Sequence, residues 1–414
     1  MKGYQFEDTQ GTFHLKKAEN ISYLYFPIAG EAGLKSSLTP NLGGDAKIDQ
    51  NTFLLEPVSA ENLVNNRNSR NFWCNVKGIG SWSLTGNAAE ALSKKFTEMQ
   101  DDSEVTAGFM WQKTTRESKK YQLRGEILSF IPVEKNVEVM LVTITNTGRM
   151  AQTVTPTAAI PLYGRSADNI RDHRHVTSLL HRIETTDIGV LVTPTLSFDE
   201  RGHQVNHMTY YCVGWSGNGE KPVDFYPTAE DFVGEGGNFE RPYAIVKNAE
   251  GVKAGTRIEG LEAVGGLHFS EVTLEPEEEC SYLIFTGITE DIQEIRNLSK
   301  TYTTREMVLE ELEKTKAYWQ EKVNVAYHTG DSDFNQFMHW VSFQPILRRI
   351  YGCSFLPHHD YGKGGRGWRD LWQDCLALLI MNPDGVRQML LDNFAGVRVD
   401  GSNATIIGSK QGEF

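Results

Sequence analysis

Long apolar runs are missing from this sequence. Its 414 residues contain no stretch of about 18 consecutive apolar residues, so no segment is predicted to cross a bilayer. The start of the chain, MKGYQFEDTQ, lacks the apolar core of a signal peptide, which argues against secretion by a cleaved signal. Excess positive charge is also missing, because the net charge is -13. Nucleic acids and anionic membranes attract basic surfaces, so both are unexpected as partners.

Cysteines are few and lack the spacing of a metal site. The five are Cys74, Cys212, Cys280, Cys353 and Cys375. They predict reduced, mostly buried thiols of a cytoplasmic protein, and a catalytic cysteine stays an open alternative. The nearest candidate metal group is His358-His359-Asp360, but adjacent histidines in a loop more often face solvent or form hydrogen bonds. We therefore expect no metal site.

The composition is otherwise that of a large globular protein. Hydrophobic residues make up 39% and charged residues 23% of the chain, and its length allows two domains or more with an ample core. No internal repeat or low-complexity segment is visible.

Residues 1–288 predict one large antiparallel β-sandwich domain. Short extended runs rich in β-branched and aromatic residues alternate with turn signals such as Asn146-Thr147-Gly148. Several runs are apolar on both faces, which is typical of strands between two packed sheets. The clearest runs are residues 21–29, 136–146, 189–198, 207–215 and 280–288. A small helix is expected over residues 87–95.

The apolar period then becomes helical. Residues 289–299 and 303–323 predict two helices, and Thr303 with Glu306 has the spacing of a capping box at the start of the second. We interpret residues 289–325 as a helical linker that packs on a neighbouring element.

From residue 326 to 414 the chain reads as helices joined by loops. A helix over 331–350 begins at an Asp331 cap, and Pro345 is expected to kink or end it. Its apolar face comprises Phe334, Phe337, Met338 and Val341. Further helices are expected over 370–381 and after Pro383, the last with Val386, Met389, Leu390 and Phe394 pointing inward. So few helices cannot cover one another well, which suggests a fragment of a longer protein.

The stretch that carries chemistry is residues 356–379, LPHHDYGKGGRGWRDLWQDCLALL. Glycines allow a backbone to approach a ligand closely, and arginine forks suit carboxylate or phosphate. Tryptophan offers a flat face to a sugar ring or to a core. The pattern fits an anion-and-sugar pocket at a helix start, and equally a glycine-rich loop clamped by Arg–Asp pairs. The Walker spacing of a nucleotide-binding loop is absent from its GKGGRG segment.

At GRGWRDLWQDCLALL, residues 365–379, the sequence resembles the inverting disaccharide phosphorylases, the cellobiose and chitobiose phosphorylase family of glycoside hydrolase family 94. Residues 78–86, 199–206, 226–237 and 334–344 are similar to other parts of that family. The branch that looks closest is that of the 1,2-β-oligoglucan phosphorylases. The resemblance covers essentially the whole chain. It implies a multidomain fold, β then α: a β super-sandwich (1–288), a helical linker (289–325) and the beginning of an (α/α)6 barrel (326–414).

The resemblance also implies roles for individual residues. Arg369 and Asp370 match the pair that binds sugar hydroxyls next to the bond being broken. Gln373 and Asp374 would line or brace the same pocket, with Asp374 either touching sugar or holding Arg369 in place. Arg366 and Lys363 would help to hold phosphate. Trp368 is grouped with the sugar-binding residues, although packing is its simpler role.

The implied reaction is phosphorolysis of a β-linked glucan oligosaccharide or disaccharide with inversion, giving α-glucose 1-phosphate. It needs phosphate as co-substrate and no metal or organic cofactor. The general acid of the family, an aspartate, is expected beyond residue 414, so the chain by itself is expected to lack turnover. The resemblance also implies a homodimer. Two alternatives stay open: an inverting glycoside hydrolase, and a non-catalytic carbohydrate-binding or dimerisation module.

Overall fold

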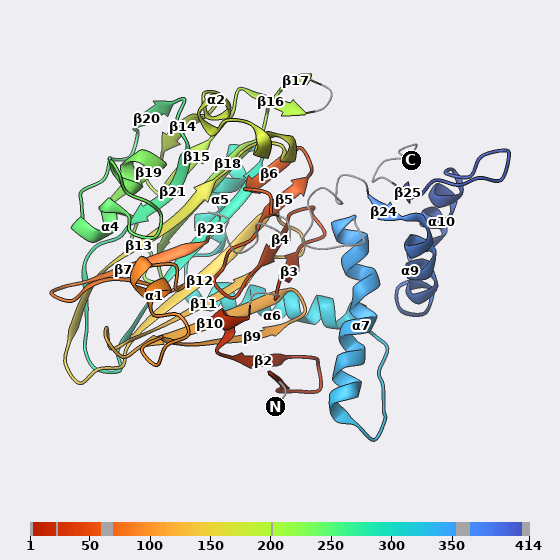
Figure 1. Ribbon diagram of the computed structural model, residues 1–414, viewed down its shortest axis with the longest axis horizontal. Coiled ribbons are helices and arrows are strands. Elements are labelled where there is room, and N and C mark those ends of the chain that lie inside the picture. The colour runs from red at the N-terminus through yellow and green to blue at the C-terminus, as the bar shows by residue number, and fades with distance from the viewer. Residues whose placement is uncertain (1–2, 22–23, 59–68, 200–201, 353–364, 408–414) are drawn as a thin grey trace.

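The computed structural model describes residues 3–21, 24–58, 69–199, 202–352 and 365–407. Most of them form a β-sandwich, and three of the helices, α7, α9 and α10, lie along one side of it (Figure 1). The two large sheets are antiparallel throughout, as expected. None of the helices in these ranges combines the length and apolar character needed to span a bilayer.

The larger sheet has eleven strands, and the facing sheet has a path of five strands with a sixth at its side. In spatial order the larger sheet comprises β1 (Tyr4–Phe6), β2 (Phe13–Lys16), β9 (Asp102–Gly108), β10 (Trp111–Ser118), β11 (Leu123–Phe130), β12 (Val137–Asn146), β23 (Glu279–Thr289), β18 (Thr209–Ser216), β15 (Gly189–Val192), β14 (Arg182–Thr185) and β20 (Arg257–Glu259). The smaller sheet comprises β19 (Asp224–Thr228), β21 (Ala263–His268), β13 (Gln152–Leu162), β7 (Asn71–Val76) and β8 (Gly80–Ser83), with β22 (Val272–Leu274) paired to β13.

Smaller elements complete the fold. A four-stranded sheet comprises β3 (Phe26–Ala29), β4 (Lys35–Leu38), β5 (Ala46–Asp49) and β6 (Thr52–Leu55). Two further antiparallel pairs are β16 (Leu196–Asp199) with β17 (Gly202–Val205), and β24 (Arg366–Gly367) with β25 (Ile406–Ile407), the latter joined across α9 and α10. The helices are α1 (Ala89–Ser93), α2 (Arg174–Ser178), α3 (Ala229–Val233), α4 (Tyr243–Lys247), α5 (Ile292–Thr301), α6 (Arg305–Lys322), α7 (Ser332–Tyr351), α9 (Trp368–Met381) and α10 (Val386–Phe394), with 3₁₀ turns η1 (Ala18–Asn20) and η2 (Ala167–Arg171).

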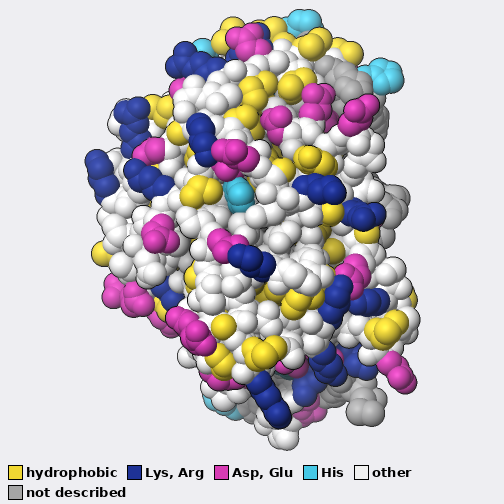
Figure 2. Space-filling model, turned by 90° about the vertical axis from the view of Figure 1, so that its left-hand side faces the viewer, with side chains coloured by type: hydrophobic (Ala, Val, Ile, Leu, Met, Phe, Trp, Pro, Cys, Tyr) yellow, Lys and Arg dark blue, Asp and Glu magenta, His cyan; other side chains and the backbone are white. Residues whose placement is uncertain are grey.

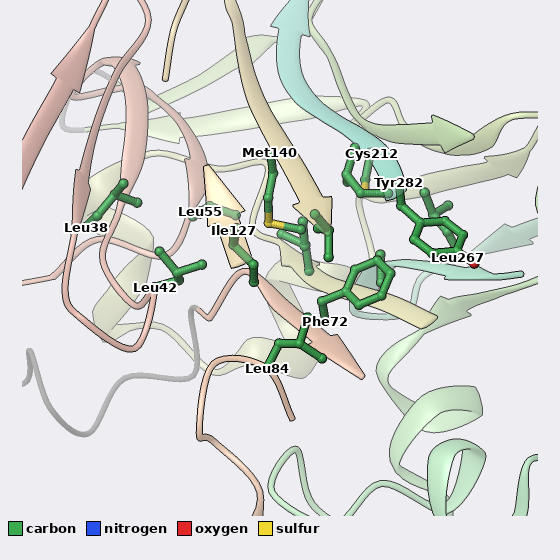
Figure 3. Packing of buried hydrophobic residues seen from close by; sticks show 14 of the residues in the cluster. Leu38, Leu42, Leu55, Phe72, Leu84, Ile127, Met140, Cys212, Leu267 and Tyr282 are labelled. Atoms are coloured by element: carbon green, nitrogen blue, oxygen red, sulfur yellow. The ribbon is translucent and has the colours of Figure 1, made fainter. Parts of the chain in front are cut away.

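The core lies between the two large sheets. Strand β12 explains its composition: Met140 and Val142 point to the facing sheet, while Val139 and Leu141 point to the opposite side. Successive strand residues alternate between the faces, so a strand buried on both sides carries apolar residues on both. The polar residues of β12 are buried as well, and its Glu138 is paired with Arg70. Figure 3 shows side chains from β7, β11, β12, β18, β21 and β23 meeting in this layer.

Helices α5 and α6 cover the outer face of the larger sheet. Tyr302, just after α5, accepts a hydrogen bond at its carbonyl from the indole of Trp215 on β18 at 3.0 Å, and its ring stacks on Phe285 of β23. The expected packing of these helices on a neighbour is therefore confirmed. The cap lies one residue later than the sequence predicts. Helix α6 is capped at Thr304, and the carboxylate of Glu306 forms a hydrogen bond with the Thr304 side chain.

Helix α7 docks on the sandwich with a different face from the one expected. The indole of Trp340 donates to the carbonyl of Gly11 at 2.7 Å, and its ring lies 4.7 Å from that of Phe109. Phe334, Phe337 and Val341, the predicted apolar face, are exposed instead. Phe394, expected to point inward from α10, is exposed too. Helix α7 also continues through Pro345 to Tyr351, because the turns after the proline are fixed by packing of Ile346, Leu347 and Tyr351.

Two predicted strands are shorter than expected. The run 21–29 contributes only β3, Phe26–Ala29, and the run 189–198 divides into β15 and β16 on either side of Pro194. Proline has no N–H to donate to a neighbouring strand, which explains the second interruption.

Candidate functional site

The candidate site lies where α9 begins. Arg366 and Gly367 form the short strand β24, which pairs with β25, and the backbone N–H of Trp368 donates to the carbonyl of Thr405 at 3.0 Å. This pairing fixes the chain directly before the helix (Figure 1). Side chains of the first two turns of α9 therefore have defined positions relative to the end of α7.

The centre of the site is a buried carboxylate held by two arginines. Asp374 is 1% exposed at its side chain. It accepts hydrogen bonds from Arg348 of α7, at 2.9 Å from Nε and 2.5 Å from Nη2, and from Nη2 of Arg366 at 2.6 Å. Charge-assisted bonds of this length are among the strongest in proteins. Two guanidinium groups against one carboxylate leave this cluster with a net positive charge.

Arg366 retains donors beyond those used by Asp374. Its side chain is 8% exposed, and its Nε is buried with no hydrogen-bond partner among the described residues, which do not include 353–364. A buried N–H without a partner is costly, so such a group marks a place where an acceptor fits. Arg348, which is 30% exposed, borders the same place. The arrangement can hold an oxyanion.

Arg369 and Gln373 lie outside this cluster. Both are exposed, one turn apart on α9, and Arg369 is 83% exposed. Arg369 pairs with its neighbour Asp370 at 3.1 Å. The expectation that Asp374 might hold Arg369 is wrong, because Asp374 instead pairs with Arg348 and Arg366 in the described part of the chain.

Trp368 packs against other aromatic side chains. Its ring centroid lies 5.6 Å from that of Trp372, which lies 4.8 Å from that of Phe394. Its indole N–H approaches the carbonyl of Asn393 at 3.4 Å. These contacts agree with a packing role for Trp368.

The thiol beside the cluster is a poor nucleophile. Burial raises the pKa of Cys375, and the neighbouring Arg366 opposes this only in part. A protonated thiol does not attack an electrophile. The raised pKa keeps the Cys375 thiolate scarce at neutral pH, which disfavours a nucleophilic role.

Two sequence-predicted groups lie outside the described residues: Lys363 and His358-His359-Asp360. Among the residues that are described, no three His, Cys, Asp or Glu side chains gather as a metal site would require. The residue that sequence reasoning missed is Arg348. Its only signal was its place near the end of a helix directly before the glycine-rich stretch.

Comparison with known proteins identifies a family for the sandwich part of the chain. The profile described as "Glycosyl hydrolase 94, supersandwich domain" matches residues 57–305. A curated relative, the cyclic β-(1,2)-glucan synthase NdvB of Rhizobium meliloti (strain 1021), is 27% identical over 203 residues, which is 46% of this chain and 6% of that protein.

Two solved structures share the fold. A putative kojibiose phosphorylase from human microbiome has a TM-score of 0.50 at 9% identity, over 94% of this chain and 48% of its own. A bacterial glucoamylase complexed with acarbose has a TM-score of 0.53 at 9% identity, over 92% of this chain and 51% of its own. The chain thus spans about half the length of these structures and a small part of the curated relative. Since the family profile matches more than half of the chain, the chain belongs to the glycosyl hydrolase 94 supersandwich family.

Proposed function

We propose that the protein is an inverting carbohydrate phosphorylase, which cleaves a β-linked gluco-oligosaccharide or disaccharide with inorganic phosphate to give α-glucose 1-phosphate. The observation that carries the proposal is the cluster of Arg348 and Arg366 around buried Asp374. Its net positive charge stands out in a chain of net charge -13. Arginine forks of this kind suit a phosphate better than a neutral water nucleophile.

The reaction needs fewer protein groups than hydrolysis does. An inverting hydrolase uses one carboxyl group as acid and a second to activate water. Phosphate is already anionic at neutral pH, so one acid and a cationic phosphate site are sufficient. We assign the acid to no residue of this chain, and its expected place beyond residue 414 stays a prediction.

Each residue has one proposed task. Arg366, with Arg348 and Lys363, holds phosphate. Arg369, Asp370 and Gln373 bind sugar hydroxyls from the exposed side of α9. Asp374 orients the two arginines, and Trp368 supports the helix by packing.

The finer features of the protein are also proposals. We propose a β-1,2-linked substrate, supported by the printed name of the NdvB relative and by the sequence resemblance. Helices α7, α9 and α10 would begin an (α/α)6 barrel in residues 326–414, after a sandwich of residues 1–288 and a linker of residues 289–325. A homodimer is part of the same proposal.

The test supplies a β-1,2-linked glucose disaccharide with and without phosphate to the protein expressed with whatever coding sequence follows residue 414. α-Glucose 1-phosphate formed only with phosphate is the expected result. Arg366→Lys keeps the charge but loses the planar fork, so the KM for phosphate should rise about tenfold. Arg369→Ala, as the matched variant, should raise the KM for the sugar instead.

Two results would replace the proposal. Free glucose released without phosphate would indicate a hydrolase. Saccharide binding without turnover, unchanged in Arg369→Ala and Asp370→Ala, would indicate a carbohydrate-binding module.

A further inference from the structure

A cavity of about 600 Å³ lies in the sandwich, away from α9. All of its lining residues belong to positions 19–262. Its floor is the outer face of the smaller sheet. On β7, Phe72, Cys74 and Val76 point to the core between the sheets, while Asn71 and Trp73 point the other way and line the cavity. Helices α1 and α3, with loops 39–43 and 237–240, form its walls.

The walls are fastened to one another. The amide Nδ2 of Asn87 donates to the carbonyl of Asn41 at 3.0 Å, which ties loop 39–43 to the residues before α1. The backbone N–H of Ala89 in α1 donates to the carbonyl of Glu240 at 2.8 Å, which ties α1 to loop 237–240. The cavity is therefore preformed, and its volume is in the range typical of small-molecule sites.

The floor presents a donor that has no protein partner. Asn71 is 5% exposed, and its Oδ1 accepts from the hydroxyls of Ser83 at 2.8 Å and Thr85 at 2.9 Å. These two bonds fix the amide, whose NH₂ group bonds to no residue in the described ranges. The fixed Asn71 amide therefore directs its NH₂ group toward a ligand in the cavity.

The charge of the lining selects the kind of ligand. Among the described residues, the lining carries four carboxylates, Glu19, Glu230, Glu240 and Glu262, and one lysine, Lys95; Glu19 is paired with Arg116. An acidic lining repels phosphate and other anions. Carboxylate and amide groups together accept from and donate to hydroxyls, and half-buried Phe239 adds an apolar surface for C–H groups.

We propose that this cavity is a second saccharide-binding site, which holds a neutral sugar unit independently of the cluster at α9. On the side of the sandwich where Figure 1 labels α1 and α4, acidic and basic side chains are interspersed (Figure 2). The inference does not depend on phosphorolysis, because it concerns binding alone.

The test is calorimetric titration of the 414-residue chain with a β-1,2-linked glucose disaccharide and, separately, with glucose 1-phosphate. We expect the neutral disaccharide to bind and the anionic sugar to bind at least tenfold more weakly at the cavity. Asn71→Asp keeps both acceptor contacts but replaces the donor, so it should weaken disaccharide binding at least tenfold. Glu240→Gln, on the exposed rim, should weaken it severalfold with no effect on folding.

The control variant is Phe337→Ala, on the exposed face of α7 and away from the cavity, which should leave this binding unchanged. Thermal unfolding identifies any variant that fails to fold, and Glu240→Gln then carries the test. Disaccharide binding that is lost in Arg369→Ala but retained in Asn71→Asp and Glu240→Gln would overturn the proposal. Absence of binding at millimolar disaccharide would overturn it as well. Neither result bears on the phosphate requirement of turnover, which the assay above measures.

Discussion

Asp374 shows how one side chain shapes the candidate site. It is buried, it lies on α9, and it bonds one arginine from α7 and one from β24. Burying an ion pair costs desolvation energy, so such a pair adds little net stability compared with apolar packing. What it does provide is a fixed orientation for two guanidinium groups. Removing the carboxylate would leave buried positive charge without compensation.

The change Asp374→Asn tests this. We expect a loss of about 3 kcal/mol in the free energy of unfolding, because Arg366 is nearly buried and would lose its counter-charge. Urea denaturation followed by circular dichroism measures it. Arg369→Ala, at an 83% exposed position, should change stability by less than about 0.5 kcal/mol. Equal effects of the two substitutions would contradict the structural role of Asp374.

At the scale of elements, α7 joins the helical part of the chain to the sandwich. Gln336 and Trp340 bond to the backbone of Gly11, and Phe343, Ile346 and Leu347 pack in a cluster shared with Phe109 and Trp319. The opposite side of the helix carries exposed aromatic and aliphatic residues. Helix α7 therefore contacts the sandwich through one of its faces only.

Two aromatic residues on opposite faces of α7 make a matched pair. Trp340→Ala removes ring contacts and the hydrogen bond to Gly11, so it should cost roughly 3 kcal/mol and expose α7 to protease. Phe337→Ala, at a 52% exposed position, should have little effect on either. Limited proteolysis with mass spectrometry and chemical unfolding measure both. A similar cleavage rate in the two variants would show that α7 docks in another way.

A surface ion pair between Glu31 of the sandwich and Arg349 of α7 also connects these two parts, and it makes their contact sensitive to acid. Burial alone would raise the pKa of Glu31, but hydrogen bonds from Arg349 of α7 and Tyr318 of α6 lower it below its ordinary value of 4.5. Because the folded-state pKa lies below the unfolded one, the pair stabilises the fold above pH 4.5, and this contribution disappears as the pH falls below it. Glu31→Gln should flatten the loss of stability between pH 6 and pH 3. Identical pH profiles of the two proteins would contradict this.

The sequence predicts these elements unevenly, for physical reasons. The run 136–146 agrees with β12 almost to the residue, because a strand buried on both faces is rich in β-branched and other apolar residues on both. The buried face of α7 could not be predicted, since its partner Gly11 lies 325 residues away from Gln336. The same holds in the site. Arg366 and Asp374 were both named as candidate site residues, but their pairing was not predicted, and Arg348 joins them only through folding.

At the scale of the whole molecule, the sandwich core and the core beneath the helices are expected to open with different ease. Cys212 lies on β18, between strands β15 and β23 of the larger sheet, and is completely buried. Cys375 lies on α9, whose opposite face exposes Leu376, Leu379 and Ile380. The buried side chains Cys375 and Leu378 of α9 pack in one hydrophobic cluster, which is shared with α7. Opening of the helical region therefore exposes less core than opening of the sandwich.

Pulsed alkylation in increasing urea tests this order. Burial raises the pKa of both thiols, so both should be unreactive in the native state at pH 8. Cys375 should become labelled at a lower urea concentration than Cys212, with mass spectrometry identifying each site. Cys280, which is half-buried near the beginning of the central strand β23, serves as an internal reference for the strand ends of the sandwich. Labelling of Cys212 before Cys375 would contradict the expected order.

The central position of β12 has a consequence for biosynthesis. One neighbouring strand, β11, directly precedes β12 in the sequence. The other, β23, lies far downstream, since its Gly287 pairs with Val137 of β12. A ribosome adding about 5–20 residues per second needs on the order of 10–30 s to deliver that second partner. Throughout this delay a strand that is apolar on both sides has an open edge. The nascent chain is thus a substrate for chaperones until residue 289 has emerged, and faster translation of this interval should improve the yield of folded protein.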